Sequence, residues 1–123
     1  MLKLPKRMNV HPSMARSKRQ EKELAYRVGG RTVIASGSLD VKGDVRKKRV
    51  LRIEAKTTGN KSFSVTREMV RKIEEAAMAS DEMPALVVEF NDNGKPVSSV
   101  AVVPVWCLEM MCDYMEKTNG SGK

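Results

Sequence analysis

The chain has 123 residues and a formal net charge of +8, and this length predicts one domain with one modest core. A hydrophobic fraction of 41% is too high for a wholly disordered chain. No apolar run approaches the roughly 18 residues of a membrane-spanning helix, and the basic N-terminus lacks the apolar core of a secretory signal. Cys107 and Cys112 do not make a disulfide framework, so we expect free thiols in a reducing cytoplasm.

The first half of the chain predicts a helix followed by three strands. Residues 1–12 are basic and contain two prolines, so we expect a flexible arm. Ser13 or Ser17 can cap a helix that runs to about Val28, where Gly29-Gly30 ends it. Strands are expected over residues 31–36, 44–47 and 50–56, with a Gly/Ser loop at 36–43.

The second half predicts a helix, two strands and a last helix. A short extended piece at 63–65 leads to Thr66, which caps a helix that ends before Pro84. Strands are expected at 85–90 and 98–103, and Pro104 opens a helix through about Lys117. The methionines of this last helix are most simply core, with an interface as the second interpretation.

The order α-β-β-β-α-β-β-α predicts an α+β domain of mixed α/β character. We expect this domain to span residues 13–118, between the basic arm at 1–12 and a disordered tail at 119–123.

The charge is separated along the chain. Residues 1–72 carry a net charge of +14, whereas residues 73–123 carry −6. This separation favours a polyanion partner such as nucleic acid over a generic basic protein with a solvated surface. One Trp, two Tyr and two Phe are too few for an extended base-stacking platform. Membrane-surface binding is less favoured, because the basic arm lacks an amphipathic aromatic face.

Three charged residues point to metal chemistry. Glu54 and Lys56 share one face of the expected strand, roughly 7 Å apart. If the hairpin turns near Lys48, Asp44 comes opposite or diagonal to Glu54. Two neighbouring carboxylates repel each other, and a hard divalent cation relieves the repulsion. With a lysine beside them, they make the inventory of metal-assisted phosphodiester hydrolysis, to which Glu21 on the first helix can add a carboxylate.

Alone, a Glu-Ala-Lys triplet occurs often by chance on an exposed strand face. The order of the motifs, however, resembles the PD-(D/E)xK nuclease superfamily, and within it the small Holliday junction resolvases of archaeal and phage type. RQEKELAYRVGG resembles their first helix, SGSLDVKGDV the loop to the metal aspartate, and RIEAKTT the Glu-x-Lys strand. VTREMVRKIEEAA resembles the following helix, which leads into PALVVEF, so the resemblance covers about residues 17–90. It implies a restriction-endonuclease-like core, with a central mixed sheet of about five strands flanked by helices.

The resemblance also implies roles for individual residues. Asp44 and Glu54 would ligate Mg²⁺ or Mn²⁺, with the carbonyl of Ala55 as a further ligand. Lys56 would position or polarise the hydrolytic water, and Glu21 would support the metal or the water. Contacts to DNA are expected from residues near the site: Arg16, Lys18, Arg19, Arg31, Ser36, Ser38, Lys42, Arg46, Lys47, Lys48 and Arg49.

The chain departs from the family pattern in two places. Gly43 stands where the superfamily has a proline before the aspartate. The first-strand arginine has no sure counterpart, because Arg31 lies too early and Ala35 is nearest to its place. Two acids also compete with the assigned ones. Glu23 is an alternative to Glu21 as the first-helix glutamate, but helical geometry favours Glu21. Asp40 is an alternative to Asp44 as the metal aspartate, but Asp44 lies nearer in register to Glu54.

We therefore expect a Mg²⁺-dependent endodeoxyribonuclease that resolves four-way DNA junctions by two symmetric cuts, leaving 5′-phosphates. Two cuts call for two sites, so we expect a homodimer. It would act on nucleoid or phage DNA in the cytoplasm, without a small-molecule cofactor or a membrane. The alternatives are a non-catalytic basic DNA-binding or architectural protein, and a PD-(D/E)xK nuclease that acts on other DNA.

Overall fold

The computed structural model describes residues 12–33 and 44–120. The chain is an α+β domain whose five-stranded mixed sheet is flanked by helices, in the order that the sequence predicts. The elements are α1 (Pro12–Val28), β1 (Arg31–Thr32), β2 (Val45–Lys47), β3 (Leu51–Thr58), α2 (Arg67–Met78), β4 (Met83–Asp92), β5 (Lys95–Val102) and α3 (Val105–Gly120). Among the described residues, no helix has both the length and the apolar character needed to cross a membrane.

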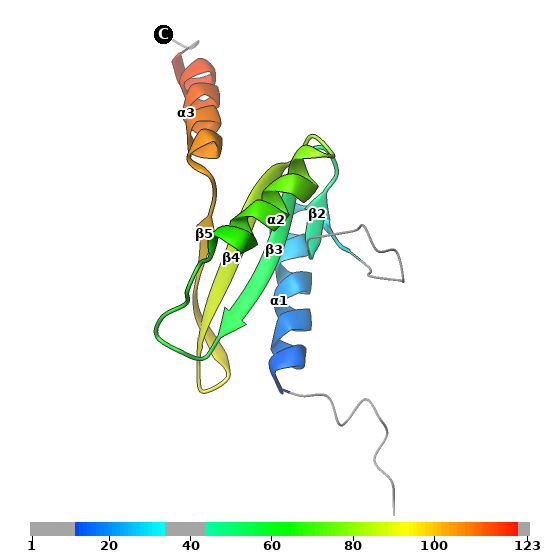
Figure 1. Ribbon diagram of the computed structural model, residues 1–123, viewed down its shortest axis with the longest axis vertical. Helices are drawn as coiled ribbons and strands as arrows, with labels where there is room; N and C mark the ends of the chain where they lie inside the picture. Colours follow the sequence, from blue (N-terminus) through cyan, green and yellow to red (C-terminus); the bar gives the residue numbers. More distant parts are fainter. Residues whose placement is uncertain (1–11, 34–43, 121–123) are drawn as a thin grey trace, which may run out of the picture.

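The strands lie in the sheet in the order in which they occur along the chain, β1-β2-β3-β4-β5. Neighbouring strands are antiparallel except for β3 and β4, which are parallel and are connected through α2. Figure 1 shows α2 in front of β3 and β4, α1 behind the other half of the sheet, and α3 extending away from the body. A sheet covered on both faces by helices requires apolar residues on both faces of its central strands.

The burial pattern of the strands agrees with this requirement. Leu24 and Ala25 of α1 pack in one cluster with Val45, Ile53, Ala85 and Val87 of the sheet. The intervening residues of β4, Leu86 and Val88, are also buried and point to the opposite face, because side chains alternate along a strand. That face receives α2, which contacts β4 and buries Ile73 and Ala77.

Several helix and strand limits follow the sequence prediction. Thr66 is the N-cap of α2, and its Oγ1 accepts a hydrogen bond of 3.2 Å from the backbone N–H of Met69. Gly29 ends α1 with a φ of +70°, a conformation that glycine adopts without a steric penalty. A Cβ at Gly30 would lie 2.6 Å from the carbonyl oxygen of Arg46, so this glycine lets β2 approach the end of α1 closely.

Other limits differ from the prediction. Helix α1 begins at Pro12, so Ser13 and Ser17 lie inside the helix and do not cap it. Residues 63–65 belong to no strand of the sheet and lead into the N-cap of α2. Helix α3 continues past Lys117 to Gly120. Strand β1 ends at Thr32, and the remainder of the expected strand from residue 34, the loop at 36–43 and arm residues 1–11 lie outside the described residues.

A buried carboxylate ties the β2–β3 hairpin to the start of β4. Glu82 has a fully buried side chain, and its Oε2 accepts hydrogen bonds from Arg46 Nε at 2.6 Å and from the backbone N–H of Arg49 at 3.0 Å. Its Oε1 accepts a hydrogen bond of 2.8 Å from Arg52 Nε. Burial acts to raise the pKa of Glu82, but these hydrogen bonds together outweigh it and hold the pKa below its usual value. The ionised carboxylate thus holds both strands of the hairpin.

Replacing this carboxylate should therefore cost far more than replacing an exposed one. We expect Glu82→Gln to lower the free energy of unfolding by about 3 kcal/mol, because the arginines lose the charge that compensates their burial. Glu75→Gln is the matched control, since Glu75 is an exposed ion-pair partner of Arg71 and should cost less than about 1 kcal/mol. Urea unfolding at neutral pH measures both changes, and equal losses in the two variants would contradict a structural role for Glu82.

Candidate active site

The register of β2 against β3 brings Asp44 beside Glu54. Val45 pairs with Ile53, and the backbone N–H of Asp44 donates a hydrogen bond of 2.7 Å to the carbonyl of Ile53. The Oδ2 atom of Asp44 accepts a second hydrogen bond, of 2.8 Å, from the backbone N–H of Ala55. Asp44 is therefore fixed against β3 through both its backbone and its side chain. Its partners Ile53 and Ala55 are the residues on either side of Glu54.

Asp44 lies close enough to Glu54 to act on its protonation. The pKa of Glu54 is raised to about 7, first by burial and then by the hydrogen bond and the negative charge of Asp44. Lys56 opposes this shift, with its Nζ 3.9 Å from Oε2 of Glu54. One positive charge at this distance does not offset the burial and the neighbouring carboxylate. The pair therefore favours the uptake of a proton or of a cation.

Glu21 adds a third negative charge at longer range. It lies half-buried on α1, and its pKa is raised by burial and then by Asp44, whereas Lys18 acts to lower it. Glu21 also contributes to the raised pKa of Glu54. In the described part of the chain, no three His, Cys, Asp or Glu side chains gather into a ready-made metal cluster. Glu21 thus acts electrostatically on the pair from α1.

The donor set at this point fits a hard divalent cation. Mg²⁺ takes oxygen ligands and is commonly held by one or two protein carboxylates, with water and substrate phosphate completing its shell. Asp44 and Glu54 supply two carboxylates that repel each other without a cation or proton between them. The N–H and C=O of a strand residue point to the same side, so the carbonyl of Ala55 faces the side from which Asp44 binds its N–H. Two carboxylates and one carbonyl can therefore hold the ion.

Gln20 is a buried polar residue near the site that sequence reasoning missed. Its Nε2 donates a hydrogen bond of 2.9 Å to the carbonyl of Lys56 and lies 3.5 Å from the carbonyl of Val87. The side chain is 2% exposed, and its Oε1 has no hydrogen-bond partner. Gln20 and Glu21 lie four and three residues before Leu24, so both spacings fit the buried stripe of α1. The structure distinguishes the two residues, because Gln20 is buried whereas Glu21 is half-buried.

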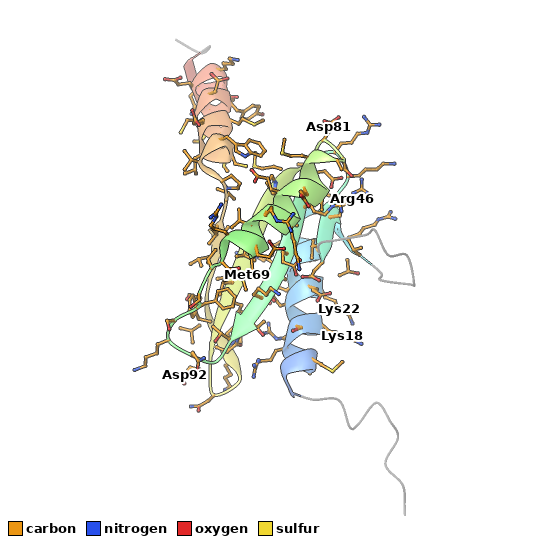
Figure 2. The ribbon with its side chains drawn as sticks, in the orientation of Figure 1. Lys18, Lys22, Arg46, Met69, Asp81 and Asp92 are labelled. Atoms are coloured by element: carbon orange, nitrogen blue, oxygen red, sulfur yellow. The ribbon has the colours of Figure 1, made fainter. Side chains whose placement is uncertain are left out.

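The predicted DNA contacts divide into two groups. Arg19 binds the buried carboxylate of Glu89, also contacts Glu23 at 3.3 Å, and so serves an internal ion pair. Arg46 is similarly bound to Glu82. Lys18, Arg31, Lys47, Lys48 and Arg49 are exposed and Arg16 is half-buried, whereas Ser36, Ser38 and Lys42 lie outside the described residues. Figure 2 shows Lys18, Lys22 and Arg46 on the same side of the molecule in this view.

A basic hollow lies beside the hairpin. It has a volume of about 540 Å³ and is bounded by the end of α1, by β1 and by β2. Arg31, Lys47 and Lys48 line it together with Gly29 and Gly30, which add no side chain to the space. Exposed cations around a hollow of this size can receive phosphate groups.

Comparison with known proteins adds no family assignment: neither a protein-family model nor a curated protein sequence matches the chain. The interpretation of the site therefore depends on its own residues.

The raised pKa of Glu54 makes the stability of the metal-free protein depend on pH. Because the folded-state pKa of about 7 exceeds the ordinary value of 4.5, the folded protein holds a proton that the unfolded chain has lost. Stability should therefore be highest below pH 4.5 with respect to this group and should decline as the pH rises through 7. We compare the free energy of unfolding of Glu54→Gln with that of the wild type at each pH. The difference should favour the variant more at pH 8 than at pH 5, by on the order of 2 kcal/mol.

Urea unfolding in the presence of a chelator, at pH 5 and pH 8, measures this difference. Glu116→Gln on the exposed surface of α3 is the control and should show no such pH-dependent gain. A Glu54→Gln variant whose stability changes equally at both pH values would contradict the close approach of Glu54 to Asp44.

Proposed function

We propose that the chain is a divalent-metal-dependent DNA endonuclease of the PD-(D/E)xK type that acts on four-way junctions. The observation that carries the proposal is the Asp44–Glu54 pair, with Lys56 next to it on β3. These three side chains provide two metal-binding carboxylates and one fixed positive charge within one short hairpin. This combination suits the metal-assisted hydrolysis of a phosphodiester.

Asp44, Glu54 and the carbonyl of Ala55 would hold Mg²⁺ or Mn²⁺. The bound ion would neutralise the carboxylate pair and withdraw negative charge from the scissile phosphate. Lys56 would then donate a hydrogen bond from Nζ to the attacking water, because Glu54 already holds its ammonium group at the edge of the site. Gln20 would keep this segment of β3 in place through the carbonyl of Lys56.

The DNA backbone would lie over the exposed cations of α1, β1 and the β2–β3 turn. Arg31, Lys47 and Lys48 surround the basic hollow, and Lys18 lies on α1 close enough to act on the pKa of Glu21. Arg19 and Arg46 are engaged with Glu89 and Glu82 and would contribute mainly to the shape of this surface. A junction is cut on two strands, so the enzyme would act as a homodimer with two such sites, on DNA in the cytoplasm.

The activity depends most directly on Lys56. We expect Lys56→Ala to lower the rate of Mg²⁺-dependent cleavage of a four-way junction by at least about 100-fold, because the attacking water loses its positioning charge. Junction binding should change little, since one cation among many is removed. Lys72→Ala removes the same charge from the exposed face of α2 and should leave cleavage unchanged. Single-turnover cleavage and mobility-shift assays separate the two effects.

A panel of four-way, flap and linear duplex DNA tests the substrate in the same assay. Faster cleavage of the junction supports the proposal, whereas faster cleavage of the flap or the duplex indicates a nuclease for other DNA. If the wild type nicks none of these substrates with Mg²⁺ or Mn²⁺, the enzymatic proposal is wrong. Binding of DNA without any cleavage would then indicate a non-catalytic DNA-binding protein.

A further inference from the structure

Helix α3 leaves the body of the protein after its first turn. Figure 1 shows it extending beyond the sheet at the end opposite to the start of α1. Its base is anchored by Trp106, whose Nε1 donates a hydrogen bond of 2.7 Å to Glu74 of α2, and by the fully buried Cys107. Every residue from Leu108 to Gly120 is exposed. Most of this helix therefore has no partner among residues 12–33 and 44–120.

The charged side chains of the exposed part of α3 nevertheless lie on one side of the helix. At about 100° per residue, its charged side chains Glu109, Asp113, Glu116 and Lys117 fall within one arc of about 100°. Leu108, Met111 and Met115 lie outside this arc, at the i, i+3, i+7 spacing with which two helices pack against each other. Their side chains are 50%, 36% and 59% exposed, and we call these three residues the α3 seam.

Such a helix is not expected to remain alone in water. It has 16 residues and a length of about 24 Å, close to the limit below which isolated helices are marginal. Tyr114 and Val105, both 71% exposed, extend the apolar surface on either side of the seam. A contiguous apolar surface on a projecting helix marks an interaction site.

The charges of the molecule favour one kind of partner for the α3 seam over the others. The acidic arc of α3 repels nucleic acid and anionic lipid, so neither of these is expected to cover the seam. The rest of the chain is basic, because the total charge is +8 while α3 carries three carboxylates and one lysine. An acidic helix therefore complements the basic body of another copy of this chain. The start of α1 lies at the other end of the molecule and does not approach the seam.

We propose that the α3 seam binds the same seam of a second copy of this chain, with the two helices antiparallel around a two-fold axis near Met111. In this arrangement Leu108 of one copy lies opposite Met115 of the other. The two basic bodies lie at opposite ends of the helix pair, and each acidic helix end approaches the basic body of the other copy. A parallel pair would instead place the two basic bodies side by side. The proposal assigns an interface to the homodimer of the proposed function, and it is argued from the fold and its charges.

The oligomeric state tests the interface directly. Light scattering after size exclusion should give about twice the chain mass of 13.7 kDa for the wild type at micromolar concentration. Met111→Glu places a charge at the centre of the seam and should weaken dimerisation at least 100-fold. Lys117→Glu places the same side chain within the charged arc, where it changes the net charge by two units, and should leave the dimer intact. A monomeric wild type, or a Met111→Glu variant that dimerises like the wild type, would overturn the proposal.

Cysteine cross-linking tests the antiparallel register. It is carried out on the dimer, so its result does not depend on whether a monomeric variant folds. In a Cys112→Ser background, Leu108→Cys and Met115→Cys proteins are mixed, exchanged and oxidised with copper phenanthroline. The mixture should form a disulfide-linked dimer, whereas Met115→Cys alone should not. Efficient cross-linking of Met115→Cys alone, or none in the mixture, contradicts the antiparallel pair. Mn²⁺ binding by Met111→Glu should equal that of the wild type, so a failure of the dimer proposal is distinguishable from a failure of the metal site.

Discussion

The contact between β2 and β3 is the constraint on which the candidate site depends, and Glu82 holds that contact in register. Its buried carboxylate accepts hydrogen bonds from Arg46 on β2, from the turn at Arg49 and from Arg52 on β3. A slip of one residue would turn Asp44 to the face opposite Glu54. The same slip would separate the arginines from Glu82 and leave a buried charge without compensation. A carboxylate outside the site thus keeps the two carboxylates of the site together.

Two glutamates in this fold, the buried Glu82 and the half-buried Glu54, show how their surroundings determine what a carboxylate does. Arginines and a backbone N–H reach Glu82, so its pKa is lowered and it stays ionised as a structural anchor. The closest acidic neighbour of Glu54 is Asp44, and Lys56 is only at 3.9 Å, so the pKa of Glu54 is raised. Glu82 is surrounded by its counter-charges, whereas Glu54 shares the single charge of Lys56 with the neighbouring Asp44. A divalent cation would supply further positive charge there, within the half of the chain that carries most of the positive charge.

Local patterns predicted most of the fold and part of the site. Alternation in VLRIEAK and the short turn before it place Glu54 near Asp44, because a hairpin register needs only the strands themselves. Gln20 was missed on the stripe of α1, because its spacing from Leu24 suits the stripe as well as that of Glu21 does. The partners of Arg19 and Arg46 lie 70 and 36 residues away in the chain, so only the tertiary fold shows that these cations are engaged. The methionines of α3 resembled core residues, yet they are exposed. The position of Arg52 on a buried strand face was the one available signal that a buried acid such as Glu82 was needed.

Titration of the metal-free protein with Mn²⁺ in a calorimeter tests most directly whether Asp44 and Glu54 form a cation site. Below pH 7, binding should release the proton held by Glu54, and buffers of different ionisation enthalpy reveal this release. The heat of binding should disappear in Asp44→Asn and in Glu54→Gln and persist in Glu116→Gln. An absence of binding in the wild type, or equal binding in all four proteins, would contradict a metal site formed by this pair.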